Sequence, residues 1–236
     1  MKNFLLLMMG GSGVRFGGQI PKQFVKVNGN PVFSYILKGY EDCEFIDSIA
    51  VVSHKDWKDY VKEWADRLGI SKLCVIAEGG DTRSESVKNG LNALESRADE
   101  KDVVLIHDAT HPYVDKDGTK QVIEAVKEYG GATLGQRQYD TVYQMDENSM
   151  MLERVVNRKS IVSGASPEAF FYGDIHRIYG EASKEQLEAM TSAGAIALEY
   201  GIPMKVIPSN VLNLKITYKS DMDTFEKMAG TYFPRV

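Results

Sequence analysis

Short apolar runs alternate with more polar segments along most of this chain. Each run is four to six residues long. Continuously apolar runs of this length are typical of strands that are buried on both faces of a parallel sheet. We therefore expect strands at residues 4–9, 49–53, 73–76, 103–107 and 204–207.

The segments between the expected strands have helical periodicity. Apolar side chains recur three or four residues apart over 57–68, 87–94 and 122–129, which places them on one face of a helix. Asp115 suits the start of the third helix, and the glycine pair at 130–131 suits its end. The alternation predicts right-handed βαβ crossovers and an α/β fold with a Rossmann-like, doubly wound, mostly parallel sheet.

The stretch 132–158 interrupts this rhythm. Two β-leaning runs, at 133–145 and 150–156, flank a polar turn at 146–149, which predicts a β-hairpin that projects from the sheet. The hairpin is either a plain surface feature or an arm that pairs with a second subunit. Because no repeat, low-complexity tract or linker divides the chain, we expect one domain over residues 1–236, with 132–158 as its β-arm.

Charge and cysteine content narrow the class of protein. With 28 Lys and Arg against 33 Asp and Glu, the net charge is 28 − 33 = −5, which disfavours nucleic acid as a partner. The apolar run at 4–9 is far shorter than the ~20 residues that cross a bilayer, so we expect no membrane association. Cys43 and Cys74 show no metal-binding or disulfide spacing and fit a reducing, cytoplasmic location.

The candidate chemistry lies in the first 40 residues, which contain no Asp or Glu. A loop of Gly10, Gly11, Ser12 and Gly13 follows the first expected strand. Glycines let backbone N–H groups approach an anion closely, and a helix N-terminus adds its dipole. The basic side chains that follow this loop, Arg15 and Lys22, add full positive charges. Together these features predict a site for a polyphosphate.

Three established loop types do not fit this segment. A dinucleotide fingerprint lacks its third glycine, because Phe16 stands there. A Walker loop lacks its lysine, because Gln19 stands there, and a nucleophile elbow lacks its final glycine at Val14. A tight turn with incidental basic residues remains the simpler alternative.

The segments 9–15 and 21–24 resemble the signature of nucleotidyltransferases with a Rossmann-like fold. Residues 79–91 resemble the GGxxRxxSVxxGL block of the 2-C-methyl-D-erythritol 4-phosphate cytidylyltransferases and their ribitol 5-phosphate siblings. Residues 104–112 resemble the VLVHDAARP block of that family. Later blocks match in order at 140–141, 157–158, 166–167 and 213–217, so the resemblance covers nearly the whole chain.

The resemblance implies transfer of CMP from CTP to a polyol phosphate, with release of pyrophosphate, by a homodimer. Its implied catalytic residues are Arg15, Lys22 and Lys215, and Asp108 would hold Mg²⁺ as well as substrate. Besides the glycine loop, the residues implied for the cytosine and ribose are Gly80, Asp81 and Ser86. The residues implied on the acceptor side are His111, Ser166, Thr191 and, reaching from the arm to the neighbouring subunit, Thr141 and Arg158.

Several of these residues have simpler interpretations. Asp108 could cap a strand end and Ser86 could cap a helix. Lys215 could be a solvated surface lysine, and Arg158 a member of a surface ion pair. The four histidines show no metal-ligand spacing, and only His111 is of functional interest.

The departures from the family lie on the acceptor side. His111 replaces an arginine, and a histidine is shorter and only partly charged near neutral pH. The QTPQ block reads Gly-Ala-Ser-Pro-Glu over 164–168, so Glu168 puts a negative charge where an amide is usual. The TDDA block reads Thr-Ser-Ala-Gly over 191–194 and loses its carboxylates.

These departures leave the acceptor open. Residues 54–57 and the pair 157–158 favour the ribitol type, whereas Ala109 favours the methylerythritol type. We take the methylerythritol type as the main prediction. Two other functions stay open: a CTP-binding sensor without turnover, and a sugar-1-phosphate pyrophosphorylase that uses another nucleotide.

Overall fold

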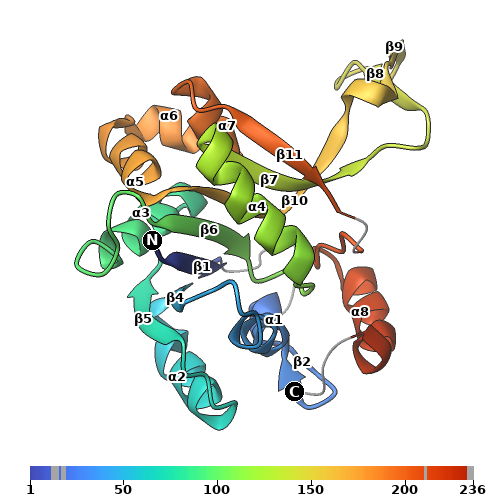
Figure 1. Ribbon diagram of the computed structural model, residues 1–236. Coiled ribbons are helices and arrows are strands. Elements are labelled where there is room, and N and C mark those ends of the chain that lie inside the picture. The colour runs from blue at the N-terminus through green and yellow to red at the C-terminus, as the bar shows by residue number, and fades with distance from the viewer. Residues whose placement is uncertain (12–15, 17–19, 210–211, 233–236) are drawn as a thin grey trace.

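A seven-stranded sheet with helices on both faces organises the computed structural model, which describes residues 1–11, 16, 20–209 and 212–232 (Figure 1). Its strands are β1 (Asn3–Met9), β4 (Ser48–Ser53), β5 (Leu73–Glu78), β6 (Val103–Asp108), β7 (Gly131–Arg137), β10 (Val162–Phe171) and β11 (Met204–Pro208). They lie in the order β11-β7-β10-β6-β1-β4-β5. All neighbours are parallel except β10, which is antiparallel to both β6 and β7.

The helices and the small strand pairs surround this sheet. The helices are α1 (Val32–Glu41), α2 (Lys58–Arg67), α3 (Arg83–Ala93), α4 (Lys116–Tyr129), α5 (Tyr172–Glu181), α6 (Lys184–Ala189), α7 (Ala193–Glu199) and α8 (Lys219–Tyr232). Short 3-10 helices are η2 (Lys22–Phe24), η3 (Lys55–Trp57) and η4 (Arg158–Ser160). The two-stranded pairs are β2 (Lys26–Val27) with β3 (Asn30–Pro31), and β8 (Val142–Met145) with β9 (Leu152–Val156). Within the described residues, no helix is both long and apolar enough to cross a membrane.

The two-residue period of a strand explains why the expected strands are apolar throughout. Alternate residues of β1 point to opposite faces of the sheet. Leu5 and Leu7 pack into the cluster that holds α1, α2 and α4. Leu6 and Met8 pack into the cluster that holds α3, α5 and α7. The doubly wound α/β fold expected from the sequence is confirmed.

Local signals set the element ends where the sequence predicted them. All five expected strands are present, as β1, β4, β5, β6 and β11. Asp115 is the N-cap of α4, where its side chain accepts a hydrogen bond from the backbone N–H of Gly118. Gly130 ends the same helix with a φ of 93°, which an L side chain rarely adopts.

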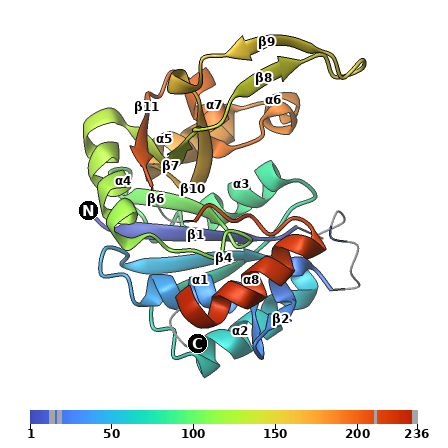
Figure 2. The same ribbon diagram turned by 90° about the vertical axis from the view of Figure 1, so that its right-hand side faces the viewer.

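The expected arm over 132–158 is wrong at its start. Residues 131–137 form β7, which lies inside the central sheet between β10 and β11. Only the β8–β9 hairpin projects, and it stands clear of the sheet in both views (Figures 1 and 2). The sequence also gave no sign of β10, because this strand contains Pro167 at a register shift between Ala165 and Glu168.

The strand order changes direction beside β1. The chain passes from β1 to β4 and β5 on one side and then returns to β6 on the other. Ligands of open α/β sheets bind outside the carboxyl ends of the strands at such a switch point. Met8 pairs with Asp108 in the register of β1 and β6, so the loop after β1 and the end of β6 lie side by side there.

We expect the fold to be sensitive to volume at Gly90. A Cβ there would lie 2.6 Å from side-chain carbons of Leu6 and Val52, in the layer between α3 and the sheet. Gly90→Ala is therefore expected to lower the free energy of unfolding by about 1–3 kcal/mol, as overpacking does. Gly180→Ala is the matched control, because a Cβ there meets nothing within 4 Å in an exposed turn of α5. Urea unfolding should show the control unchanged or more stable by up to about 1 kcal/mol; equal stability of the two variants would contradict this packing.

Candidate functional site

The loops that follow β1 and β5 meet at the carboxyl edge of the sheet. A Cβ on Gly10 would lie 3.1 Å from Ser86 Oγ and 3.4 Å from Gly79 Cα, so this close approach requires a glycine. The backbone N–H of Gly80 donates to Ser86 Oγ at 3.0 Å. Gly10, Gly80 and Ser86, expected on the nucleotide side, are thus brought together.

Two further nucleotide-side residues lie in the same loops. Gly11 follows Gly10 directly, and the backbone N–H of Asp81 donates to Glu85 Oε2 at 2.8 Å while the Asp81 residue stays exposed. The expected nucleotide-binding residues Ser12 and Gly13 and the expected catalytic residue Arg15 lie outside the described residues.

Ser86 does not cap α3, so its simpler interpretation is wrong. Thr82 is the N-cap: its side chain accepts from the backbone N–H of Glu85, and the Glu85 side chain accepts from the backbone of Thr82 in return. Ser86 is buried in the next turn, where its hydroxyl meets Gly80.

Gln23 joins the glycine loop to the short helix that carries Lys22. Its side-chain amide donates to the carbonyl oxygens of Met9 and Gly11, both at 2.8 Å, and the residue is only 3% exposed. Phe24, the next residue, stacks on Trp57 with ring centroids 4.3 Å apart. Gln23 therefore links the end of β1 and Gly11 to the short helix that carries Lys22.

Asp108 stands at the end of β6 between two cations. Its Oδ1 accepts from Arg83 Nε and Nη2 at 3.2 and 3.1 Å, and its Oδ2 accepts from Lys215 Nζ at 3.2 Å. Burial by itself raises the pKa of Asp108, but Arg83 and Lys215 outweigh burial and lower it to about 2. The carboxylate is thus ionised at neutral pH. Asp108 is therefore more than a strand-end cap, and Lys215 is paired with it instead of being a solvated surface lysine.

A buried histidine holds the loop after Asp108. His107 Nε2 donates to the carbonyl oxygen of His111 at 2.9 Å, because a carbonyl can only accept, and so Nδ1 accepts from the Tyr40 hydroxyl at 2.8 Å. Burial lowers the pKa of His107 to about 4. His107 is therefore a neutral structural residue that fixes the backbone at His111.

The side chain of His111 meets the acceptor-side residue Ser166. His111 Nδ1 and Ser166 Oγ are 3.0 Å apart. Burial lowers the pKa of His111 to about 3, with help from His107 and Lys215. The expectation of partial charge near neutral pH is corrected: His111 is neutral and acts through hydrogen bonds.

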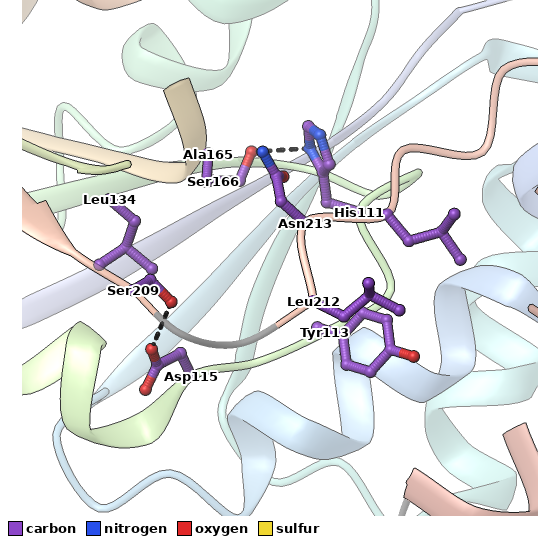
Figure 3. A pocket seen from close by; sticks show the side chains of 10 residues that line it. His111, Tyr113, Asp115, Leu134, Ala165, Ser166, Ser209, Leu212 and Asn213 are labelled. Carbon is purple, nitrogen blue, oxygen red and sulfur yellow. Dashed lines mark hydrogen bonds between the residues drawn. The ribbon is translucent and has the colours of Figure 1, made fainter. Parts of the chain in front are cut away.

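His111 and Ser166 line a small hollow of about 20 Å³ that is partly open to solvent (Figure 3). Asn213 points at the same space, and Ser209 donates to Asp115 Oδ2 at 2.8 Å at its far side. The remaining lining residues are Tyr113, Leu134, Ala165, Leu212 and Leu214. The hollow combines a few neutral hydrogen-bonding groups with apolar walls.

Three expected acceptor-side residues stay apart from this group. Thr141 and Arg158 lie where the hairpin leaves the sheet, and Arg158 donates to the carbonyl oxygen of Tyr139. Thr191 is exposed just before Ser192, the N-cap of α7. In the part of the chain that the structure describes, no hydrogen bond or ion pair joins any of the three to Asp108.

Sequence reasoning gave no role to Arg83 or Gln23. Arg83 is the first residue of α3, and a positive charge at a helix N-terminus is unfavourable unless an acid neutralises it. That signal was present in the sequence, although nothing in the sequence named Asp108 as the acid. Gln23 carried no signal, because its partners are backbone carbonyls.

The two buried neutral histidines make the fold sensitive to acid. Their folded pKa values, about 4 and about 3, lie below the ~6.5 of an unfolded histidine, so the unfolded chain binds more protons below pH 6.5. Stability is full above pH 6.5 and falls as the pH decreases towards 4, by up to about 2 kcal/mol per histidine at pH 5. Urea unfolding at pH 7 and pH 5 should show a smaller difference in His111→Gln than in the wild type. His176→Gln, at a half-buried site on α5, should keep the full difference; the same pH dependence in all three proteins would contradict the assignment.

The whole chain matches known proteins. Residues 4–230 match the family model IspD, 2-C-methyl-D-erythritol 4-phosphate cytidylyltransferase. The 2-C-methyl-D-erythritol 4-phosphate cytidylyltransferase of Thermotoga neapolitana is 33% identical over 221 residues, 94% of each chain. A ribitol-5-phosphate cytidylyltransferase of Streptococcus agalactiae is 30% identical over 230 residues, 97% of this chain and 95% of the relative.

Comparison with solved structures finds the same fold in proteins of this kind. The crystal structure of 4-diphosphocytidyl-2C-methyl-D-erythritol synthase from Anaerococcus prevotii superimposes with a TM-score of 0.82 at 23% identity, and covers 97% of this chain and 96% of that one. The family model and the relatives at 30% identity or more agree on the reaction class. The chain belongs to the IspD family of cytidylyltransferases.

Proposed function

We propose that this cytidylyltransferase transfers CMP from CTP to 2-C-methyl-D-erythritol 4-phosphate and releases pyrophosphate. The observation that carries the proposal is the group of Asp108, Arg83 and Lys215 beside the glycine loop at the switch point of the sheet. This group sets alternating charges where the phosphates of CTP and of the acceptor have to meet. One domain over residues 1–236, working in the cytoplasm, is part of the proposal.

The reaction requires that the two substrates are aligned and that the negative charge of their phosphates is neutralised. A phosphate oxygen of the acceptor forms a bond to the α-phosphorus of CTP, and the bond from that phosphorus to the oxygen bridging to the β-phosphate breaks. Pyrophosphate leaves with the electron pair of the broken bond. Because the attacking oxygen is already an anion, no strong general base is needed, and fixed cations supply most of the stabilisation.

Lysines around Asp108 provide the cations. Lys22 stands on η2 beside the glycine loop and, with Arg15, would hold the triphosphate. Lys215 is 47% exposed and is paired with Asp108 through a single hydrogen bond, so it can turn from Asp108 to the α-phosphate when CTP arrives. The nucleotide-side residues Gly10, Gly11, Gly80, Asp81 and Ser86 would surround the cytidine.

Mg²⁺ fits this site as an ion carried in by the triphosphate. Among the described residues, no group of three or more His, Cys, Asp or Glu side chains is placed to hold a metal. Mg²⁺ takes one or two carboxylates together with substrate phosphates. Asp108 is the carboxylate that fits, with Oδ2 becoming available once Lys215 turns away. When bound, the ion would add charge neutralisation at the phosphates.

The acceptor side favours hydrogen bonding to hydroxyl groups. His111 and Ser166 are neutral, and the hollow beside them has the apolar walls that a methyl-branched polyol can use. Ribitol 5-phosphate is the second candidate, because the ribitol-5-phosphate relative matches 97% of the chain at almost the same identity as the first relative.

The hairpin supports a homodimer. An isolated two-stranded hairpin is only marginally stable in water, yet this one exposes a row of large apolar side chains. They are Tyr143, Met145, Met150, Met151, Leu152 and Val155, exposed by 44–68%. A second copy of the chain would cover them, and would bring Thr141 and Arg158 towards the acceptor site of its partner.

The test of the function is pyrophosphate release from CTP and Mg²⁺ with a panel of polyol phosphates. We expect turnover with 2-C-methyl-D-erythritol 4-phosphate. Lys22→Ala should lower kcat by about 100-fold or more, because it removes a cation from the transferring phosphoryl group. Lys26→Ala, an exposed lysine two residues beyond η2, is the control and should keep wild-type turnover. Turnover only with ribitol 5-phosphate would identify ribitol 5-phosphate as the acceptor. CTP binding without pyrophosphate release on any acceptor would favour a CTP-binding sensor without turnover.

The test of the arm is the oligomeric state. Leu152→Asp combined with Val155→Asp places charges among the apolar residues of β9 and should convert a dimer to a monomer in sedimentation velocity. Acceptor affinity should fall at the same time, since the arm residues come from the second copy. Leu198→Asp, at a residue 58% exposed on α7, is the control and should leave the dimer intact. A wild-type protein that sediments as a monomer would contradict the proposed homodimer.

A further inference from the structure

Glu168 forms a contact that none of the assigned roles explains. It lies on β10 opposite Ile106 of β6, where the register resumes after Ser166 and Pro167. Its Oε1 accepts from the backbone N–H of Gly194 at 2.9 Å, and its Oε2 accepts from that of Ala193 at 3.1 Å. A carboxylate thus satisfies two of the N–H groups that the start of a helix leaves without partners.

Two departures from the family pattern form this one contact. Glu168 is the acid at a position where an amide is usual, and Ser192 and Ala193 stand where carboxylates are usual, with Gly194 in place of an alanine. A Cβ on Gly194 would lie only 2.7 Å from Glu168 Oε1. The Glu168 carboxylate therefore occupies space that a side chain at Gly194 would need. The negative charge lies on β10 instead of at the start of α7.

Glu168 is also the second acid beside Arg83. Its Oε2 lies 4.0 Å from Arg83 Nη2, and the same guanidinium bonds Asp108 Oδ1 through Nε and Nη2. The two carboxylates are largely buried, with Glu168 16% and Asp108 19% exposed, whereas the shared Arg83 side chain is 35% exposed. A line of alternating charge runs from the start of α7 through Glu168, Arg83 and Asp108 to Lys215.

We propose that Glu168 is a positioning residue for the transfer, acting through Arg83. Arg83 is held from both sides and stays on Oδ1 of Asp108. Among the described residues, Lys215 is paired with Asp108 alone and is more exposed than Arg83, so it is the cation that moves to the nucleotide. Without the charge of Glu168, Arg83 becomes a second mobile cation that competes for the phosphates, and Asp108 loses its fixed orientation. The inference rests on the proposed function.

The first variant removes the charge and keeps the shape. Glu168→Gln should lower kcat about 10-fold while the KM for CTP changes less than about 3-fold, because Asp108 and Lys215 are misaligned only where charge develops. Glu41→Gln is the matched control, since Glu41 also accepts from two backbone N–H groups, those of Ser71 and Lys72, far along the chain from this site. The control should keep wild-type kinetics.

The second variant keeps the charge and moves it. Gly194→Ala forces the Glu168 carboxylate away from the start of α7 and should lower kcat in the same way. Alanine is the better helix former, which offsets the weakened cap at the start of α7, so this variant should unfold close to the wild-type temperature. A loss of turnover with retained stability is the result that a purely structural role of Glu168 does not produce.

A third readout does not depend on turnover. Solvent exchange of the Arg83 Nε proton, followed by NMR, reports how firmly the guanidinium is held on Asp108. We expect exchange at least about 10-fold faster in Glu168→Gln and unchanged exchange in Glu41→Gln. Unchanged exchange in Glu168→Gln overturns the proposal, and so does faster exchange with an unchanged kcat. If the wild type uses no acceptor, the proposed function fails, whereas the exchange rates still decide whether Glu168 holds Arg83.

Discussion

The sharing of one carboxylate between two cations holds the site together. Asp108 is contributed by the sheet, Arg83 by the first turn of α3, and Lys215 by the segment that precedes α8. A buried carboxylate is costly unless it is paired, and removing one partner leaves a charge without compensation. Three segments from distant parts of the sequence are therefore fixed to one point at the edge of β6. The pairing also places Lys215 where, under the proposed function, a phosphate of CTP can replace Asp108 as its partner.

Close backbone approach is the second constraint, and it explains the glycines. The loops after β1 and β5 come within the distance at which Gly10 and Gly79 tolerate no Cβ without displacement. Gln23 then ties the first loop to η2 through two main-chain carbonyls. The described part of the glycine loop, Gly10 and Gly11, is thus held by contacts within the chain.

The parts of the fold that could be predicted are those set by local patterns. The apolar runs of β1 and β6 and the caps of α4 at Asp115 and Gly130 depend on nearest neighbours in the sequence. Strand β10 could not be predicted in the same way, because it owes its place to pairing with β6 and β7 and carries Pro167 at its bulge. The start of the arm was predicted wrongly for a similar reason, because β7 and β8 form a single β-leaning run in the sequence.

The same limit applies to the site. The glycine loop, Ser86 and Asp108 could be assigned by motif, because their spacing is local. The contact between Glu168 and α7 could not, since its members are 25 and 26 residues apart and none belongs to a motif intact in this chain. As separate positions, Glu168 and Ala193 are departures on the acceptor side. In space they compensate each other, because the Glu168 carboxylate accepts from the backbone N–H of Ala193.

The neutrality of His111 decides how the acceptor phosphate is bound under the proposed function. With a pKa of about 3, this side chain brings no positive charge to the position that carries an arginine in the family. The charge that a phosphate needs must then come from lysines that already serve CTP, or from the arm of a second copy, where Arg158 is exposed. In that proposal CTP would occupy Lys22 and Lys215. The acceptor phosphate would then be left to the arm of a second copy, and the proposed dimer would be a condition for turnover instead of an accessory to it.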